Sequence, residues 1–143
     1  MASAEKTVIM QASADKIYQV LKDFESYPEF MDGVSSVSIV SEDGDTTRVQ
    51  YNLNLIKKIT YTLDITCQEN QSLKWQFVEG DLFSINNGSW TLKDQGDGST
   101  EVTYQVEVDI KVKMIGSGMI VKKLTEVQLP SMLKAVEERA NAV

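Results

Sequence analysis

Residues 114–140, with the sequence MIGSGMIVKKLTEVQLPSMLKAVEERA, decide the fold, because a long alternation of apolar and polar residues gives way here to helical periodicity. Ser117, inside a Gly-Ser-Gly triplet, is a typical N-cap residue and predicts a helix start. At about 100° per residue, the apolar side chains form two stripes rotated by roughly 140° against each other. The stripes are Ile120, Val121, Leu124 and Val127, and then Leu129, Met132, Leu133, Val136 and Ala140. The sequence therefore predicts a long C-terminal helix with a break in its apolar face.

Pro130 lies at the junction of the two stripes. Proline has no N–H to donate to the carbonyl of Glu126, and its ring collides with that turn, which predicts a kink or one extra unwound residue. The alternative is that the second half of the helix packs against a different neighbour without a kink.

Strict alternation upstream predicts β-strands at 49–55, 59–66, 73–77 and 102–110, where the apolar residues fall on one parity and the polar residues on the other. A short β-branched segment predicts a further strand at 6–10, and a weaker strand is expected around 37–40. The alternation is typical of an antiparallel sheet with one face in water and one in the core. The predicted fold class is therefore α+β, with a curved antiparallel sheet of six or seven strands wrapped around the long C-terminal helix.

The parity slips by one residue late in the sheet. Phe83 and Ile85 are apolar at odd positions, whereas Trp90 and Leu92 are apolar at even ones. The Asn-Gly pair that ends at Gly88 is a common hairpin turn, which would divide the segment into two strands. A β-bulge with Gly88 in a left-handed conformation explains the slip within one strand and would curve the sheet. We favour the bulge, because a hairpin would leave its first strand very short.

Two short helices are predicted before the sheet. Ser13 is a suitable N-cap for the first, and its apolar face repeats at i, i+3, i+4 and i+7. That face consists of Ile17, Val20, Leu21 and Phe24. The residue before a proline is pushed out of helical geometry, so Tyr27 ends this helix. Pro28 then opens the second helix, at 29–31, which ends at Gly33.

At 143 residues the chain fits one domain, 1–143, large enough for a core without disulfides or metals. The net charge of −7 opposes contact with nucleic acid or an anionic membrane. No apolar run approaches the roughly 20 residues that span a bilayer, and the first residues lack the apolar region of a signal peptide. With Cys67 as the single cysteine, these features predict a protein of the reducing cytoplasm.

The sequence identifies no catalytic residue, metal site or cofactor site. Histidine, the commonest general base and metal ligand, is absent. Cys67 falls on the inward parity with no histidine to activate it, so we interpret it as a small buried apolar residue. Glu107 and Asp109 fall on the wet face as solubilising charges, and the acidic turn around Gly44 lacks the spacing of a calcium loop.

The apolar parity places most of the large aromatic residues on the dry face of the sheet. A helix about 10 Å wide covers only part of a concave sheet, which leaves room for a pocket lined by these residues. The alternative is a solid core without an open cavity. The candidate ligand-binding residues are Phe30, Tyr51, Leu53, Tyr61, Leu63, Trp75, Phe77, Phe83, Trp90, Tyr104, Val106, Met119 and Leu124.

Four short motifs are spread along the whole chain. They are FESYPEFMDGV at 24–34, GDLF at 80–83, Gly88-Ser89-Trp90, and Arg139-Ala140. Together with the order of elements, they resemble the helix-grip fold of the START-like (SRPBCC) superfamily, the polyketide cyclase/dehydrase and lipid transport group. The chain is most similar to the branch that holds coenzyme Q-binding proteins, oligoketide cyclases and the bacterial ribosome-association toxin.

The resemblance implies a single START-like domain that holds a hydrophobic ligand between the sheet and the C-terminal helix. Tyr27, Pro28 and Phe30 match the segment that shapes the pocket entrance region in this superfamily. Asp32 and Gly33 stand where several quinone-binding relatives have proline and tryptophan, which counts against a quinone as the ligand.

Three functions remain as alternatives. The first is non-catalytic binding or transport of a lipid, quinone or polyketide. The second is a polyketide cyclase or aromatase that uses Tyr51, Tyr61 and Tyr104 as hydrogen-bond donors in the same cavity. The third is an interaction protein like the ribosome-association toxin. The tip at 55–59, where apolar residues flank two lysines, is either a plain turn or a point of transient membrane contact.

Overall fold

The computed structural model describes residues 2–31, 33–54, 58–110 and 129–142. The helical elements are α1 (Ala14–Lys22), the 3₁₀ helix η1 (Phe24–Glu29) and α3 (Leu129–Ala142). The strands are β1 (Ala2–Met10), β2 (Val34–Asp43), β3 (Thr46–Asn54), β4 (Lys58–Gln68), β5 (Ser72–Gly80), β6 (Phe83–Asp94) and β7 (Thr100–Ile110). None of the helices in these ranges is long and apolar enough to cross a membrane.

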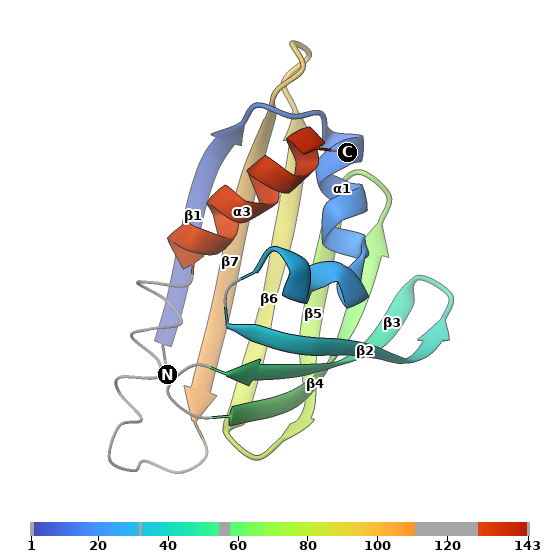
Figure 1. Cartoon of the computed structure of the whole chain (residues 1–143), viewed down its shortest axis with the longest axis vertical. Helices are drawn as coiled ribbons and strands as arrows, with labels where there is room; N and C mark the ends of the chain where they lie inside the picture. Colours follow the sequence, from blue (N-terminus) through green and yellow to red (C-terminus); the bar gives the residue numbers. More distant parts are fainter. Residues whose placement is uncertain (1, 32, 55–57, 111–128, 143) are drawn as a thin grey trace.

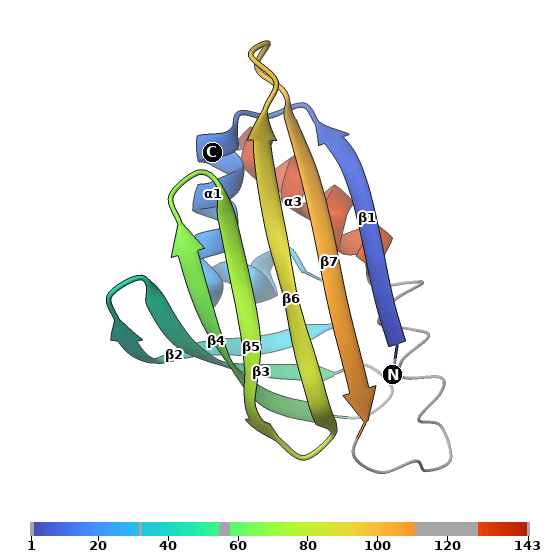
Figure 2. The same ribbon diagram turned by 180° about the vertical axis from the view of Figure 1, so that it is seen from behind.

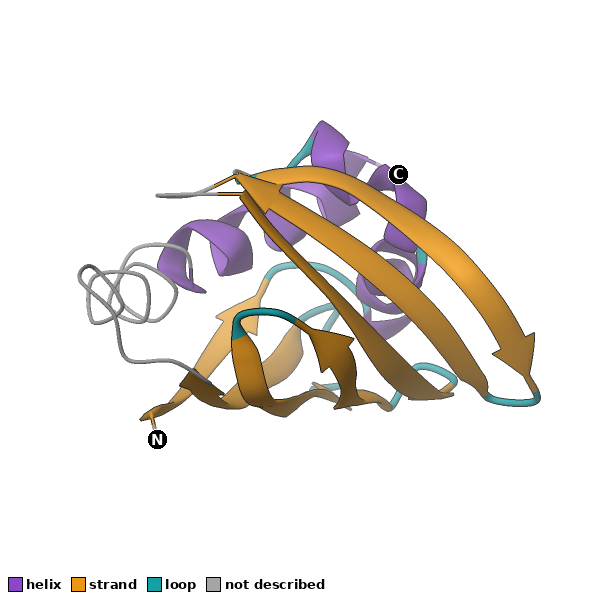
Figure 3. Cartoon of the chain, turned by 90° about the horizontal axis from the view of Figure 1, so that it is seen from below, coloured by secondary structure: helices purple, strands orange, loops and turns teal. Residues whose placement is uncertain are grey.

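All seven strands form one antiparallel sheet in the order β1-β7-β6-β5-β4-β3-β2 (Figures 1 and 2). Strands β2 to β7 follow each other as neighbours, and β1 pairs with β7, from Ala2 opposite Val108 to Met10 opposite Thr100. The sheet bends around the helices, which lie in its concavity (Figure 3). The predicted α+β architecture, a curved antiparallel sheet with a helix at its C-terminal end, is confirmed.

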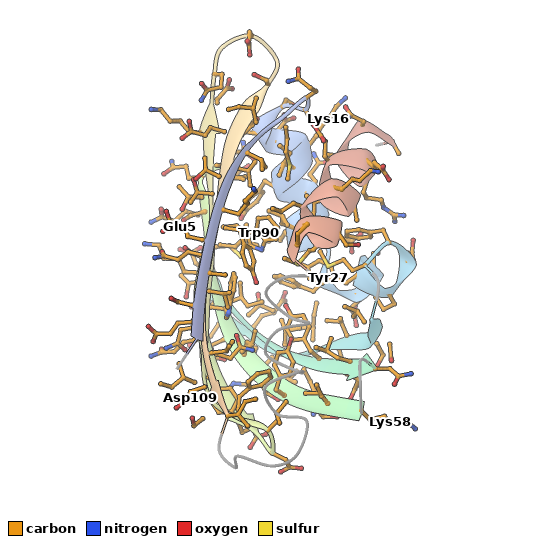
Figure 4. The ribbon with its side chains drawn as sticks, turned by 90° about the vertical axis from the view of Figure 1, so that its left-hand side faces the viewer. Glu5, Lys16, Tyr27, Lys58, Trp90 and Asp109 are labelled. Atoms are coloured by element: carbon orange, nitrogen blue, oxygen red, sulfur yellow. The ribbon has the colours of Figure 1, made fainter. Side chains whose placement is uncertain are left out.

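The two faces of the sheet differ as the parity predicts. Figure 4 shows Tyr27 and Trp90 between the sheet and the helices, and Glu5 and Asp109 on the opposite side. The outer face carries cross-strand polar pairs. In one of them, Asp64 accepts hydrogen bonds from Arg48 Nε at 2.9 Å and from Nη2 at 3.1 Å. The guanidinium lowers the pKa of the Asp64 carboxyl below its ordinary value.

Helices α1 and α3 pack against each other and close one end of the concave face (Figure 1). Ile17 and Leu21 of α1 are fully buried, as the predicted spacing requires. On α3, Leu133, Val136 and Ala140 are buried, which agrees with the second predicted stripe. Pro130 is the second described residue of α3, and the residues before Leu129 lie outside the described part, so the predicted kink stays a prediction. The first stripe and the predicted helix start at Ser117 lie outside the described residues, as do residues 55–57 of the predicted membrane-contact tip.

The helix boundaries near the N-terminus correct the prediction. Helix α1 ends at Lys22, because Asp23 has φ −84° and ψ 68°, well outside helical geometry. The second helix is a 3₁₀ helix that contains Pro28, begins at Phe24 and shares only Glu29 with the predicted 29–31. Phe24 therefore belongs to η1, where its ring meets the ring of Tyr27 edge to face at 5.9 Å. The turn that follows ends at Gly33, whose φ is +84°.

Strand β6 is continuous, so the hairpin at 87–88 does not form and one strand carries the parity slip. The irregularity, however, lies between Phe83 and Ile85 and not at Gly88. Gly88 is not in the left-handed region, which corrects the predicted bulge position. A glycine is required there for another reason: a Cβ at this position would lie 2.3 Å from Cζ2 of Trp75.

Candidate functional site

A cavity of about 150 Å³ lies between the concave face of the sheet and the helices. Every strand from β2 to β7 contributes to its wall, and η1, the turn after it and α3 supply the rest. The wall consists of Phe24, Tyr27, Met31, Val34, Tyr51, Leu53, Tyr61, Leu63, Ile65, Leu73, Trp75, Phe83, Asn86, Trp90, Tyr104, Val106, Val108 and Met132. No charged side chain is among these residues, so the described wall is apolar except for phenol, indole and amide groups.

Most of the predicted ligand-binding residues lie in this wall. They are Tyr51, Leu53, Tyr61, Leu63, Trp75, Phe83, Trp90, Tyr104 and Val106. Phe30 and Phe77 do not line the cavity; Phe77 packs against Phe83 with ring centroids 6.5 Å apart. Met119 and Leu124 lie outside the described residues. That the wall residues bind a ligand stays a prediction.

The other nine residues of the wall are not among the predicted ligand-binding residues, although Tyr27 belongs to the segment expected at the pocket entrance. Ile65, Leu73 and Val108 share the apolar parity of the predicted residues and were available from that signal. Phe24 and Tyr27 come from η1, Met31 comes from the turn after it, and Val34 is the first residue of β2. Met132 of α3 belongs to the predicted second apolar stripe. Asn86 is the one residue of the described wall that no sequence pattern indicates, because the parity slip leaves open which face of the sheet it lies on.

The aromatic rings of the wall contact one another along the sheet. Tyr61 stacks on Tyr51 with centroids 5.2 Å apart, and meets Phe83 edge to face at 5.2 Å. Tyr104 touches both indoles, that of Trp90 at 4.8 Å and that of Trp75 at 5.5 Å between centroids. Such pairs each contribute about 0.5–1.5 kcal/mol beyond the area they bury. The wall is therefore held in shape by contacts within itself.

Four tyrosines line the cavity, and burial favours the protonated form of each. Burial raises the pKa of Tyr27, Tyr51, Tyr61 and Tyr104 above the ordinary value of 10. The Tyr27 hydroxyl donates to the carbonyl of Leu21. The other three make no hydrogen bond to a described residue, and every buried side-chain oxygen in the described part has a partner, so these hydroxyls are open to the cavity. They offer hydrogen-bond donors, but no base.

An ion pair joins two elements of the wall at the molecular surface. Arg139 of α3 donates from Nη2 to Oε1 of Glu29 at 2.7 Å. The same guanidinium lies 5.2 Å from the centroid of the Phe30 ring, a cation–π distance. Phe30 thus supports the contact between η1 and α3 from outside the cavity.

The described residues hold no set of groups arranged for nucleophilic or metal chemistry. Cys67 is buried, and burial raises the pKa of its thiol, which opposes formation of the reactive thiolate. This agrees with its interpretation as a small core residue. No three of the described Cys, Asp and Glu side chains are grouped to hold a metal ion. The described wall of the cavity therefore offers hydrogen-bond donors and lacks a charged catalytic pair.

The comparisons with known proteins agree with this geometry. The model of the polyketide cyclase/dehydrase and lipid transport family matches residues 10–137. The chain belongs to this family. Among curated family relatives, the ribosome association toxin RatA of Escherichia coli K12 is 26% identical, over 100% of this chain and 89% of that protein. The RatA of Vibrio cholerae El Tor is 25% identical, over 100% of this chain and 98% of that protein.

Several solved structures share the fold. A protein from Thermus thermophilus has a TM-score of 0.86 at 23% identity, covering 99% of this chain and 98% of its own. An aromatase/cyclase from Streptomyces sp. R1128 has a TM-score of 0.86 at 18% identity, covering 98% and 93%. A START superfamily protein from Mycobacterium smegmatis has a TM-score of 0.83 at 23% identity, covering 98% and 97%. The predicted superfamily is confirmed.

Proposed function

We propose that this chain binds a small, uncharged, apolar or amphipathic molecule in the cavity, without transforming it. The observation that carries the proposal is a void of about 150 Å³ whose wall is almost entirely aromatic and aliphatic. A charged ligand would lose its hydration there and find no opposite charge in the described wall, which is strongly unfavourable. Transfer of an apolar ligand from water into the same surroundings is favourable.

The volume limits how much of a ligand the cavity can hold. About 150 Å³ accommodates a benzene-sized ring, and is about half of the ~300 Å³ at which pockets for drug-sized ligands begin. A long acyl chain or a complete polyketide exceeds this volume. We therefore propose as ligand a single-ring molecule, or the ring or short chain at the end of a larger one.

Non-catalytic binding fits the wall better than chemistry does. A phenol with a raised pKa is a hydrogen-bond donor and a poor acid, and the buried thiol of Cys67 is a poor nucleophile. Positioning alone can still accelerate a reaction of a folded polyketide chain. A carrier or sensor of a small lipophilic molecule requires none of these groups.

Fluorobenzene is a suitable probe, since its ¹⁹F resonance reports binding and its size matches the void. We expect a shifted or broadened bound signal with the wild-type chain, and its loss in Val106→Phe, which fills the wall from β7. Gln105→Phe adds the same ring on the exposed face of the same strand and should leave the signal unchanged. A wild-type chain that leaves the fluorobenzene resonance unaltered would contradict the proposal.

A polyketide cyclase or aromatase is the second candidate function. It is favoured by the three open hydroxyls of Tyr51, Tyr61 and Tyr104, and by the likeness in fold to the Streptomyces aromatase/cyclase. Incubation with a poly-β-ketone substrate tests it. Cyclised product that disappears when the three tyrosines are changed to phenylalanine would establish the enzyme and replace the carrier proposal.

Interaction with the ribosome is the third candidate and follows from the RatA relatives. The net charge of −7 opposes contact with the phosphate backbone of ribosomal RNA, so we propose no nucleic-acid partner. Co-sedimentation of the chain with ribosomes at physiological salt would favour this candidate, and recovery of the chain only in the supernatant would dismiss it.

A further inference from the structure

Asn86 is the one amide in the described cavity wall. It lies on β6 opposite Val108 of β7, and only 7% of its surface is exposed. A side-chain amide has two donors and one acceptor oxygen, and burying it among apolar groups is unfavourable unless these are paired. A buried amide in this apolar wall is therefore expected to have hydrogen-bond partners for its oxygen and its NH₂ group.

The irregularity in β6 turns Asn86 toward the cavity. Successive residues of a strand point to opposite faces, and one extra residue reverses the alternation beyond it. The register of β6 with β7 shifts between Phe83 and Ile85, so that Phe83 and Asn86 both reach the cavity while Ile85 does not. With regular alternation, Ile85 would share the face of Phe83 and Asn86 would face the solvent.

The orientation of the Asn86 amide is fixed by Trp75. The indole Nε1–H of Trp75 donates to Oδ1 of Asn86, with 3.2 Å between the nitrogen and the oxygen. An indole nitrogen donates and never accepts, so the oxygen of the amide must face it and the Nδ2 group must point away. The indole itself is held in place by Gly88, opposite Trp75 in the ladder, because only a glycine leaves room for the ring over β6.

The Nδ2 donors of Asn86 have no partner among the described residues. Every buried side-chain nitrogen in the described part is hydrogen-bonded, and Nδ2 is not, so it is accessible. For a residue this deeply buried, the accessible surface available is that of the cavity it lines. The protein thus presents two fixed N–H groups to whatever occupies the void.

We propose that Asn86 is a specificity-determining residue whose Nδ2 donates a hydrogen bond to a carbonyl-type oxygen of the ligand. The inference rests on the proposed binding function and narrows its ligand class. The open hydroxyls of Tyr51, Tyr61 and Tyr104 are further donors, so the polar groups of the cavity favour an acceptor on the ligand. Because the described wall carries no cation, that acceptor is a neutral ketone, aldehyde, ester or amide oxygen and not a carboxylate.

Acetophenone and α-methylstyrene test the proposal, because they have the same shape and differ by an oxygen in place of a CH₂ group. Binding of each to ¹⁵N-labelled wild-type chain is followed by NMR. We expect acetophenone to bind about five- to tenfold more tightly, which is the gain of one neutral hydrogen bond. We also expect it, and not α-methylstyrene, to shift the side-chain NH₂ resonances of Asn86.

Two variants separate a ligand-binding role from a merely structural one. Asn86→Leu should bind both probes equally, with α-methylstyrene bound at least as tightly as in the wild type. Asn87→Leu is the matched control: Asn87 accepts from the N–H of Phe77 at 3.0 Å, lies outside the wall, and should keep the preference for acetophenone.

The outcomes distinguish this inference from the function on which it rests. If neither probe binds the wild type, the binding cavity itself is refuted, and the role of Asn86 with it. If both bind equally and the Asn86 resonances do not move, the cavity stands and the role of Asn86 is wrong. If Asn86→Leu does not fold, the wild-type ratio and the wild-type NH₂ shift still decide.

Discussion

Substitution of Gly88 by alanine tests the packing that holds the cavity wall. A Cβ at this position would lie 2.3 Å from Cζ2 of Trp75 and 2.3 Å from the backbone oxygen of Gln105. Ordinary van der Waals contact begins about 1 Å further out, so the indole or the strand must move. The carbonyl belongs to β7, directly beside β6, and a shift there disturbs the ladder.

The magnitude follows from two opposing effects. Overpacking a well-filled site costs about 1–3 kcal/mol, and a displaced indole also loses its hydrogen bond to Asn86, about 1 kcal/mol. In the other direction, alanine restricts the unfolded chain and stabilises by about 0.4–1 kcal/mol. We therefore expect Gly88→Ala to lower the free energy of unfolding by about 2 kcal/mol.

Urea denaturation followed by circular dichroism measures this difference. Ser89→Ala, one residue further along β6, adds no atom and should change the free energy of unfolding by less than about 0.5 kcal/mol. If Gly88→Ala is as stable as the wild type, or more stable, then the indole of Trp75 does not lie against β6. The indole would then not be held where it orients the Asn86 amide.

Three further measurements test the surroundings of particular tyrosine and aspartate side chains. Tyr27→Phe removes the donor to a buried carbonyl and should destabilise by about 1–3 kcal/mol, whereas Tyr51→Phe, whose hydroxyl is open to the cavity, should be nearly neutral in urea unfolding. All five tyrosines have a raised pKa in the fold, and that of Tyr18 is about 12. The absorbance of tyrosinate at 295 nm should therefore rise only near pH 12 or when the protein unfolds. Since the unfolded phenols ionise near 10, folding stability should fall above that pH. Because the pKa of Asp64 is lowered from 3.8 in the fold, the small stabilising effect of its exposed pair with Arg48 is present above about pH 4, and Asp64→Asn should match the wild type near pH 2.

Strand parity was sufficient to predict the sheet and most of the cavity wall that the sheet supplies. Tyr51, Leu53 and Tyr61 face inward because two neighbouring strands alternate without interruption. The side-chain period of a strand is two, so burial of one face fixes the orientation of every residue. The same rule explains the failure at Asn86. A shift of one residue reverses all orientations beyond it, and its position depends on how Phe83 and Ile85 pack, which no local pattern records.

Helix boundaries near the N-terminus were less predictable, because Phe24 fits two structures equally well. It continues the apolar spacing of α1, yet its ring packs on Tyr27 in η1. Helix propensity and apolar spacing do not distinguish Phe24 at the end of α1 from Phe24 at the start of η1, so tertiary contacts determine which structure forms. The size of the void was equally inaccessible, since it depends on the rotamers of the rings and not on which face they occupy.

The void itself is the strongest physical argument that the chain binds something. Side chains that line an unfilled space lose the packing contacts that a filling group would give them, which is an energetic cost. The wall of this cavity of about 150 Å³ consists almost entirely of aromatic and aliphatic side chains that bear this cost. The rings could lower this cost by collapsing toward the helices, yet Tyr61 is held between Tyr51 and Phe83, and Tyr104 between the two indoles. A molecule that fills the space without displacing a ring recovers the lost contacts, and it should therefore raise the free energy of unfolding as its concentration rises.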